Sequence, residues 1–257
     1  MHTRPRIGIT MRIEHATDRF YLGRHYSEAV EAAGGAPVHI SLIPKFDYIE
    51  AVVDGLDGIL LPGSDSDVDP LRYGQQPHPA LGVVQTIKDE TDLMIIEAVE
   101  RRRMPLLAIC FGMQVLNVSR GGTLIQDIRS QVPDAIKHEQ GVPRDRPSHR
   151  ISILENSKLS HIGGLSHSGG TLNALVNSHH HQAIESVGAD LVATAWTSDG
   201  VIEAMEDPRP DRFVMAVQWH PELGWEHDAL SQRLFKSLVS EAANARTSTL
   251  APLSTPA

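Results

Sequence analysis

Residues 105–118 read PLLAICFGMQVLNV, an apolar run, a cysteine and a glycine followed by a second apolar segment with helical spacing. The run 105–109 predicts a buried strand, and the segment after Cys110 predicts a helix. A strand that passes directly into a helix places the linking residue at the carboxyl edge of an α/β sheet, where such folds bind ligands. Because the first helical N–H groups favour a thiolate, Cys110 is a candidate nucleophile. The alternative is a buried structural cysteine, and this junction alone does not decide between the two.

Outward from this junction, apolar runs alternate with helix-like segments through the first 130 residues. Runs 6–11, 37–40 and 58–61 predict strands, and segments 26–33 and 86–103 predict helices. Strands separated by helices form a parallel sheet covered on both faces. From about Arg150, short β-rich runs between turn residues predict a mixed sheet. The expected fold is therefore α/β, with a mostly parallel central sheet and a smaller β-rich extension in the C-terminal half.

The domain organisation follows from the absence of any linker, composition break or repeat of fixed period. We expect a single domain over residues 1–245, with a helix near its end at 226–243. Residues 246–257 are polar and contain proline, so this tail is expected to be disordered.

Composition excludes several classes of function. The 257 residues carry a net charge of −9, without a basic stripe of the kind that binds nucleic acid. No apolar stretch is long enough to cross a bilayer, so no membrane partner is expected. One cysteine cannot form an internal disulfide, and the first residues lack the apolar segment of a secretory signal. We therefore expect a cytoplasmic protein acting on a small molecule, and a homodimer remains open.

A catalytic cysteine needs a base, and the base needs an orienting group. Of the 14 histidines, His220 stands out because it ends an apolar run and is followed by Pro221 and Glu222. An imidazole and a carboxylate two residues apart can act as base and orienter, although a solvated turn fits the same three residues. The loop after residues 58–61 contains Gly63, whose backbone N–H, together with that of Phe111, is a candidate oxyanion hole.

Three motifs agree in order and separation: Pro62-Gly63-Ser64, residues 108–114 (AICFGMQ) and residues 218–222 (QWHPE). Together they resemble the class I glutamine amidotransferase superfamily. Within it, the chain is most similar to the stand-alone γ-glutamyl-γ-aminobutyrate hydrolases, the peptidase C26 family. Four further segments carry that likeness: 67–74 (DVDPLRYG), 117–128 (NVSRGGTLIQDI), 176–182 (VNSHHHQ) and 198–204 (SDGVIEA). The resemblance extends from about Ile7 to Val239.

The resemblance implies a flavodoxin-like three-layer sandwich in which Cys110 attacks a γ-glutamyl amide, His220 transfers protons and Glu222 orients His220. It implies oxyanion donors at the backbones of Gly63 and Phe111. Its substrate-binding residues carry over onto Ser64, Gln114, Asn177, Ser178, His179 and His180. The expected partner is a small γ-glutamyl substrate, and the family suggests a role in putrescine or polyamine breakdown.

The chain departs from the family pattern at three positions. Phe111 stands where Arg is usual, Ala108 where Gly is usual, and Thr91 replaces an expected Arg. An Arg near the cleft would suit an acidic leaving amine. Phe111 therefore predicts a preference for a more apolar or larger amine, and Phe111→Arg is expected to change that preference more than it changes folding.

Neither a metal nor a cofactor is expected. The acidic loop 65–69 lacks the central Gly and closing Glu of an EF-hand loop. The run His179-His180-His181 offers imidazoles, but adjacent residues point in different directions. Two other functions stay open: a glutaminase subunit that delivers ammonia to a partner synthetase, and a non-catalytic protein that binds γ-glutamyl ligands.

Overall fold

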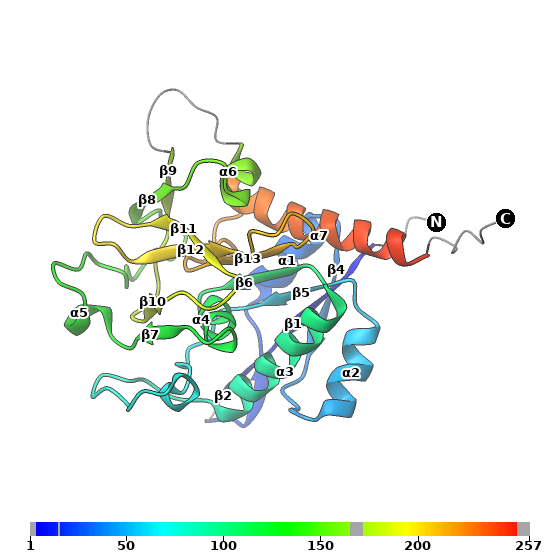
Figure 1. Ribbon diagram of the computed structural model, residues 1–257, viewed down its shortest axis with the longest axis horizontal. Helices are drawn as coiled ribbons and strands as arrows, with labels where there is room; N and C mark the ends of the chain where they lie inside the picture. Colours follow the sequence, from blue (N-terminus) through cyan, green and yellow to red (C-terminus); the bar gives the residue numbers. More distant parts are fainter. Residues whose placement is uncertain (1–3, 15, 165–171, 251–257) are drawn as a thin grey trace.

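The computed structural model describes residues 4–14, 16–164 and 172–250 of the chain. Their main sheet has nine strands and is covered by helices on both faces (Figure 1). In spatial order the strands are β4 (Ala36–Ile40), β1 (Arg6–Thr10), β5 (Gly58–Leu61), β6 (Leu106–Ile109), β13 (Val214–Val217), β12 (Ile202–Glu206), β11 (Val192–Trp196), β8 (His149–Ile153) and β9 (Leu172–Val176).

The sheet is parallel in one half and antiparallel in the other. Strands β4, β1, β5, β6 and β13 are mutually parallel, whereas β12, β11, β8 and β9 pair antiparallel. The predicted α/β fold is therefore confirmed, and the β-rich C-terminal half continues the same sheet across β13. The boundary falls at β13 because this strand, which follows the antiparallel strands in the sequence, pairs parallel with β6 on one side and antiparallel with β12 on the other.

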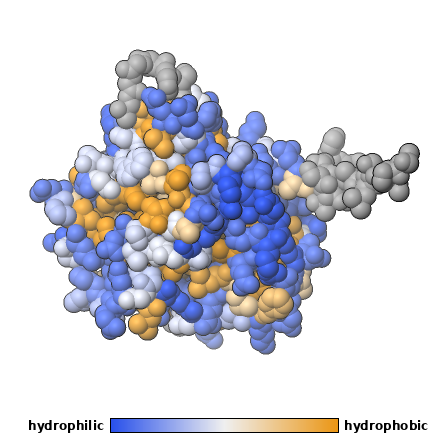
Figure 2. Space-filling model, in the orientation of Figure 1, coloured by the Kyte–Doolittle hydropathy of each residue, from blue (hydrophilic) through white to orange (hydrophobic). Residues whose placement is uncertain are grey.

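Five longer helices form the two outer layers. One face carries α1 (Arg24–Ala32) and α7 (Ala229–Leu250), and the other carries α2 (Phe46–Asp54), α3 (Thr86–Arg102) and α4 (Phe111–Ser119). Each helix turns its apolar side to the sheet, and the face drawn in Figure 2 is mainly hydrophilic with smaller hydrophobic areas between. Among the described residues, no helix combines the length and apolar character needed to cross a membrane.

Side chains of each central strand point alternately to the two faces of the sheet, so the core has two halves. In β6, Leu107 and Ile109 pack toward α1 and α7, while Leu106 and Ala108 pack toward α3 and α4. Successive side chains of a strand point to opposite faces, so a strand buried on both faces is apolar throughout. This explains why β5, β6 and β13 appear in the sequence as unbroken apolar runs.

Smaller elements surround the sheet. They are the hairpin β2 (Arg12–Glu14) and β3 (Arg19–Tyr21), the pair β7 (Thr123–Ile125) and β10 (Ala183–Ser186), the 3-10 turn η1 (Pro70–Tyr73), and the short helices α5 (Ile128–Gln131) and α6 (Lys158–Gly163). Helix α6 lies at the edge opposite the site, where Lys158 donates to backbone carbonyl oxygens of the loop before β13. The sequence did not predict the hairpin, which brings Arg12 to the site.

The C-terminal helix extends into the segment that the sequence assigned to the tail. Helix α7 continues through residue 250, five residues past the predicted domain end at 245. Residues 244–250 contain neither glycine nor proline, and the first proline is Pro252, so the helical hydrogen bonds can continue that far. The rest of the tail, 251–257, lies outside the described residues.

Candidate active site

Cys110 occupies a sharp turn between β6 and α4. Its φ of 52° and ψ of −108° are unusual for a residue other than glycine, and its side chain is 5% exposed. The turn brings the start of α4 against the end of β5: a Cβ atom at Gly112 would lie 2.3 Å from the carbonyl oxygen of Leu61. Glycine is therefore required at 112, and the turn holds Cys110 at the carboxyl edge of the sheet.

Strand β13 brings the second part of the site to the same edge. Because β13 is parallel to β6, the N–H of Cys110 donates to the carbonyl oxygen of Val217 at 2.8 Å. The chain then continues to His220, whose Nδ1 lies 2.7 Å from Oε1 of Glu222. Since a carboxylate accepts, this contact places a proton on Nδ1 and leaves Nε2 available. His220 also lies beside Cys110, close enough for this side chain to affect the pKa of its imidazole.

The electrostatics of this buried group favour a charged imidazole. Burial lowers the pKa of His220, but the negative charges of Glu222 and Cys110 outweigh burial and raise it to about 10. Burial raises the pKa of Glu222, but the neighbouring His220 and a hydrogen bond from Tyr26 lower it below its ordinary value. The arrangement therefore supports an imidazolium beside the carboxylate of Glu222.

Asn177 holds the backbone of His220 in place. Its Oδ1 accepts from the N–H of His220 at 2.9 Å, and its Nδ2 donates to the carbonyl oxygen of His220 at 2.7 Å. Both partners are backbone atoms, and Asn177 is 6% exposed. Asn177 was predicted to bind substrate, but its side chain in this structure is bonded to the backbone of the candidate base.

The backbone N–H of Gly63, a predicted oxyanion donor, already has a partner. It donates to the hydroxyl of Tyr26 at 3.0 Å, and that hydroxyl also accepts from Nη2 of Arg12 at 3.1 Å. Arg12 Nε donates to the carbonyl oxygen of Gly63 at 2.5 Å. A Cβ at Gly63 would lie 2.7 Å from the ring of His220, so glycine is needed here for close approach. The structure therefore does not leave this N–H free for an oxyanion, contrary to the prediction.

A cavity of about 260 Å³ opens beside Cys110. It is lined by Ser64, Asp65, Ser66, Asp67, Gly82, Cys110, Gln114, Glu139, His179, His180, His181 and Gln182. Among the predicted substrate-binding residues, Ser64, Gln114, His179 and His180 line it. Ser178 does not: it is fully buried, and its Oγ donates to the carbonyl oxygen of His138. A small polar cavity of this kind suits one compact ligand.

Phe111 lies away from the cavity, which corrects the expectation that its side chain contacts the leaving amine. It is 1% exposed and packs in the core between the sheet and α3, with Nζ of Lys88 5.2 Å from the centre of its ring. Phe111 is the first residue of α4, and its side chain belongs to the buried core. Only its backbone is therefore positioned to contact a ligand.

Arg12 and Tyr26 are site residues that the sequence did not predict. Both lie far from the cysteine and histidine motifs in the sequence, on β2 and α1. Arg12 is adjacent to the predicted strand 6–11, and its role depends on a hairpin with no clear turn signal. Tyr26 was placed correctly in a helix, but its hydroxyl meets Gly63 only through the packing of α1 on the sheet.

Residues 5–222 match the family Peptidase C26. The chain belongs to this family. Peptidase C26 lies within the class I glutamine amidotransferase-like superfamily, as the three motifs of the sequence predicted.

Curated relatives agree with this assignment, and a solved structure shares the fold. A glutamine amidotransferase-like protein of Lactococcus lactis is 37% identical over 203 residues, covering 79% of this chain and 81% of that protein. A gamma-glutamyl-gamma-aminobutyrate hydrolase of Escherichia coli K12 is 34% identical over 249 residues, covering 92% of each. The glutaminase domain of CTPS from Trypanosoma brucei has the same fold, with a TM-score of 0.61 at 16% identity. The match covers 93% of this peptidase C26 chain and 94% of the CTPS chain.

Proposed function

We propose that this protein hydrolyses the γ-glutamyl amide bond of a γ-glutamyl amine, with Cys110, His220 and Glu222 as the catalytic residues. The observation that supports this most is that one buried imidazole lies beside Cys110 and is hydrogen-bonded to a carboxylate, at the edge of a small polar cavity. This is the arrangement that a cysteine nucleophile requires.

In the proposed reaction, Sγ of Cys110 attacks the carbonyl carbon of the amide. The C–N bond breaks as His220 gives a proton to the departing amine, which leaves a γ-glutamyl thioester on Cys110. Water then attacks the thioester while His220 takes a proton from that water, and glutamate leaves as the thiolate reforms. Glu222 stays ionised and keeps the proton of His220 on Nδ1.

The developing oxyanion needs hydrogen-bond donors. Phe111 is the first residue of α4, so its N–H has no partner within the helix and lies next to Cys110. We propose this N–H as the principal donor. Gly63 would supply a second donor only if its hydrogen bond to Tyr26 opens when substrate binds.

The charge of the cavity favours particular leaving amines. Its lining includes the carboxylates of Asp65, Asp67 and Glu139, and none of the described residues that line it is a lysine or an arginine. An amine that carries a carboxylate, as γ-aminobutyrate does, would find the nearby guanidinium of Arg12 already paired with Asp65. We therefore propose that neutral or cationic amines, such as a diamine, are better leaving groups for this protein.

The test measures glutamate release by the purified protein alone from γ-glutamylputrescine, γ-glutamyl-γ-aminobutyrate and glutamine, with Cys110→Ala as the control. We expect cleavage that depends on Cys110 and is fastest with γ-glutamylputrescine. Glu139→Gln should raise the KM for γ-glutamylputrescine while changing the KM for glutamine little. Faster cleavage of γ-glutamyl-γ-aminobutyrate would refute the charge argument, and no release from any substrate would favour a glutaminase that needs a partner.

A further inference from the structure

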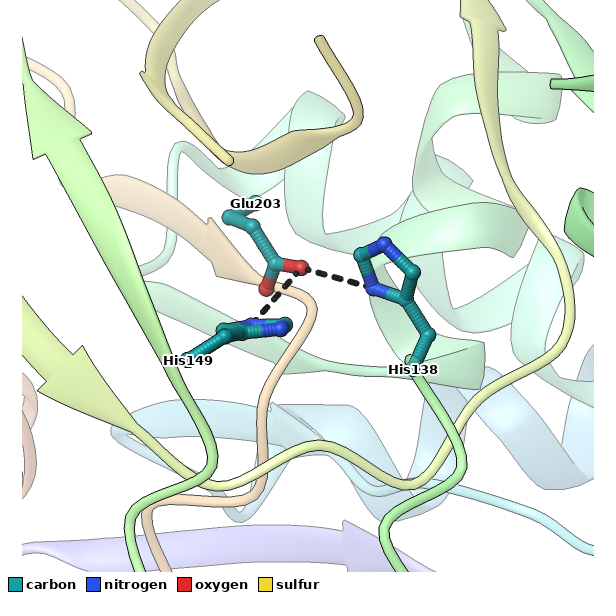
Figure 3. A group of neighbouring side chains, drawn as sticks. All are labelled: His138, His149 and Glu203. Atoms are coloured by element: carbon teal, nitrogen blue, oxygen red, sulfur yellow. Dashed lines mark ion pairs between the residues drawn. The ribbon is translucent and has the colours of Figure 1, made fainter. Parts of the chain in front are cut away.

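A second cluster of buried polar groups lies behind the cavity, around the carboxylate of Glu203 on β12. Nδ1 of His138, Nε2 of His149 and Nε2 of His180 lie 3.5, 3.3 and 3.4 Å from Oε1 of Glu203. Figure 3 shows His138 and His149 pointing at this carboxylate from opposite sides. His149 comes from β8, and the other two histidines come from the segments before β8 and after β9. Histidines from three separate parts of the chain thus converge on one oxygen of a fourth part.

The charge of Glu203 lacks an ordinary partner. Its side chain is fully buried, and neither of its oxygens has a hydrogen-bond partner among the described residues. No lysine or arginine in the described part of the chain forms an ion pair with it. A buried carboxylate of this kind requires a compensating positive charge.

His180 and His138 each use one ring nitrogen in a hydrogen bond, which leaves the lone pair of the other nitrogen directed toward Glu203. His180 Nδ1 lies 2.9 Å from the carbonyl oxygen of Gln182, and His138 Nε2 lies 3.0 Å from Oδ2 of Asp199. Because both oxygens accept, these nitrogens carry the protons. Neutral rings then present lone pairs at His180 Nε2 and His138 Nδ1, which lie only 3.2 Å apart. A histidine that binds a metal characteristically donates its other N–H in this way.

Three of these side chains are spaced as ligands of one small metal ion. Ligand atoms about 2.0–2.1 Å from a tetrahedral zinc ion lie about 3.3 Å from one another. Nδ1 of His138 and Nε2 of His149 lie 3.5 and 3.3 Å from Oε1 of Glu203, and one ligand atom of each of the three residues lies within 4.8 Å of the other two. Nε2 of His180 is 3.2 Å from Nδ1 of His138 and 3.4 Å from Oε1 of Glu203 but falls outside this group. We propose that His138, His149 and Glu203 bind one zinc ion, with His180 beside it.

The location of the cluster gives this ion access and a structural role. His138 and His180 line a cavity of about 1070 Å³ on the outer side, and His180 also lines the cavity beside Cys110. A bound ion would tie the segment that carries His138, whose ring packs against His180, to strands β8 and β12. Its three protein ligands are buried, so the ion would stabilise the fold of the site.

A proton could supply the positive charge instead. Burial lowers the pKa of His138, but Glu203 and Asp199 outweigh burial and raise it above the ordinary value, so an imidazolium is the competing arrangement. A proton and a zinc ion predict different metal contents, and the experiment decides between them.

The experiment measures metal by mass spectrometry in the full chain, produced without a histidine tag and dialysed after exposure to Zn²⁺. We expect about one zinc per chain in the wild type, in Cys110→Ala and in His227→Ala, a control on an exposed histidine. His149→Ala and Glu203→Gln should lose it. In the wild type, removal of zinc with a chelator should lower Tm by at least about 5 °C, and added Zn²⁺ should restore it.

A measurement on the wild type does not depend on whether the variants fold. Co²⁺ bound to the wild type should give the intense visible bands of a tetrahedral site, without the near-ultraviolet band of a thiolate ligand. If the protein held no stoichiometric metal and its Tm changed with neither chelator nor Zn²⁺, the proposal would be overturned, and a protonated histidine would supply the positive charge. Zinc retained by His149→Ala, or lost from Cys110→Ala, would place the ion elsewhere and also overturn it. These outcomes do not depend on whether γ-glutamyl amides are substrates.

Discussion

The side-chain amide of Asn177 bridges the backbone N–H and carbonyl oxygen of His220, with hydrogen bonds of 2.9 and 2.7 Å. Two bonds to one residue define where the imidazole stands relative to Cys110. Asn177 follows β9 at the end of the antiparallel half of the sheet, whereas Cys110 and His220 follow parallel strands. The antiparallel half therefore takes part in positioning the candidate catalytic base.

Asn177→Ala should reduce kcat by about 10- to 100-fold while changing KM little, because a displaced base slows the reaction without removing a substrate contact. Unfolding free energy should fall by about 1–3 kcal/mol, since the backbone of His220 loses two buried partners. Kinetics on the best γ-glutamyl substrate and chemical denaturation measure both effects. Asn173→Ala, an exposed residue of β9, is the control. A rise in KM at unchanged kcat would instead support substrate binding by Asn177.

The raised pKa of His220 predicts how stability depends on pH. The folded protein holds this proton up to about pH 10, whereas an unfolded histidine loses it near 6.5. The stabilisation is therefore complete below pH 6.5 and is lost as pH rises toward 10. Denaturation at several pH values should show this decline in the wild type and a shallower one in Glu222→Gln. Glu226→Gln, at an exposed position, should behave as the wild type. Equal slopes in all three proteins would contradict the assignment.

Gly112→Ala should destabilise the protein by about 1–3 kcal/mol or more, because the new Cβ would lie 2.3 Å from the carbonyl oxygen of Leu61. Gly23→Ala provides the matched control. Its nearest neighbours would be 3.9 Å away, and its φ of −61° suits any residue. Denaturant midpoints compare the two variants. An unchanged midpoint for Gly112→Ala would mean that the turn at Cys110 relaxes easily.

Phe111→Arg should impair folding rather than redirect substrate choice. Phe111 is buried beside Lys88, whose ammonium is itself buried and paired with Asp92. A second cation there has no partner, and an uncompensated buried charge costs about 3–5 kcal/mol. Phe111→Leu should cost less, since it only changes volume. Soluble yield and Tm report the difference. A stable Phe111→Arg protein with altered amine preference would restore the original interpretation of this position.

The sequence alone determined the central strands, the helices between them and the family. Strands β5 and β6 were predicted within one residue because strands buried on both faces must be continuously apolar. Cys110, His220 and Glu222 could be named as candidates because they follow such strands, and the ends of parallel strands meet at one edge. These features depend on short stretches of sequence, so they can be identified without knowing the packing.

Only the tertiary structure decided which side chains reach the cavity and how they are paired. Asn177 binds backbone, Phe111 faces the core, and the N–H of Gly63 is held by Tyr26. The cluster around Glu203 joins four segments spread over residues 138–203, with no motif spacing among them. Such contacts depend on how the antiparallel strands and loops pack, and side-chain direction at a loop has no periodic signal in the sequence. Local pattern therefore determined the framework, and long-range packing determined the roles of the residues on it.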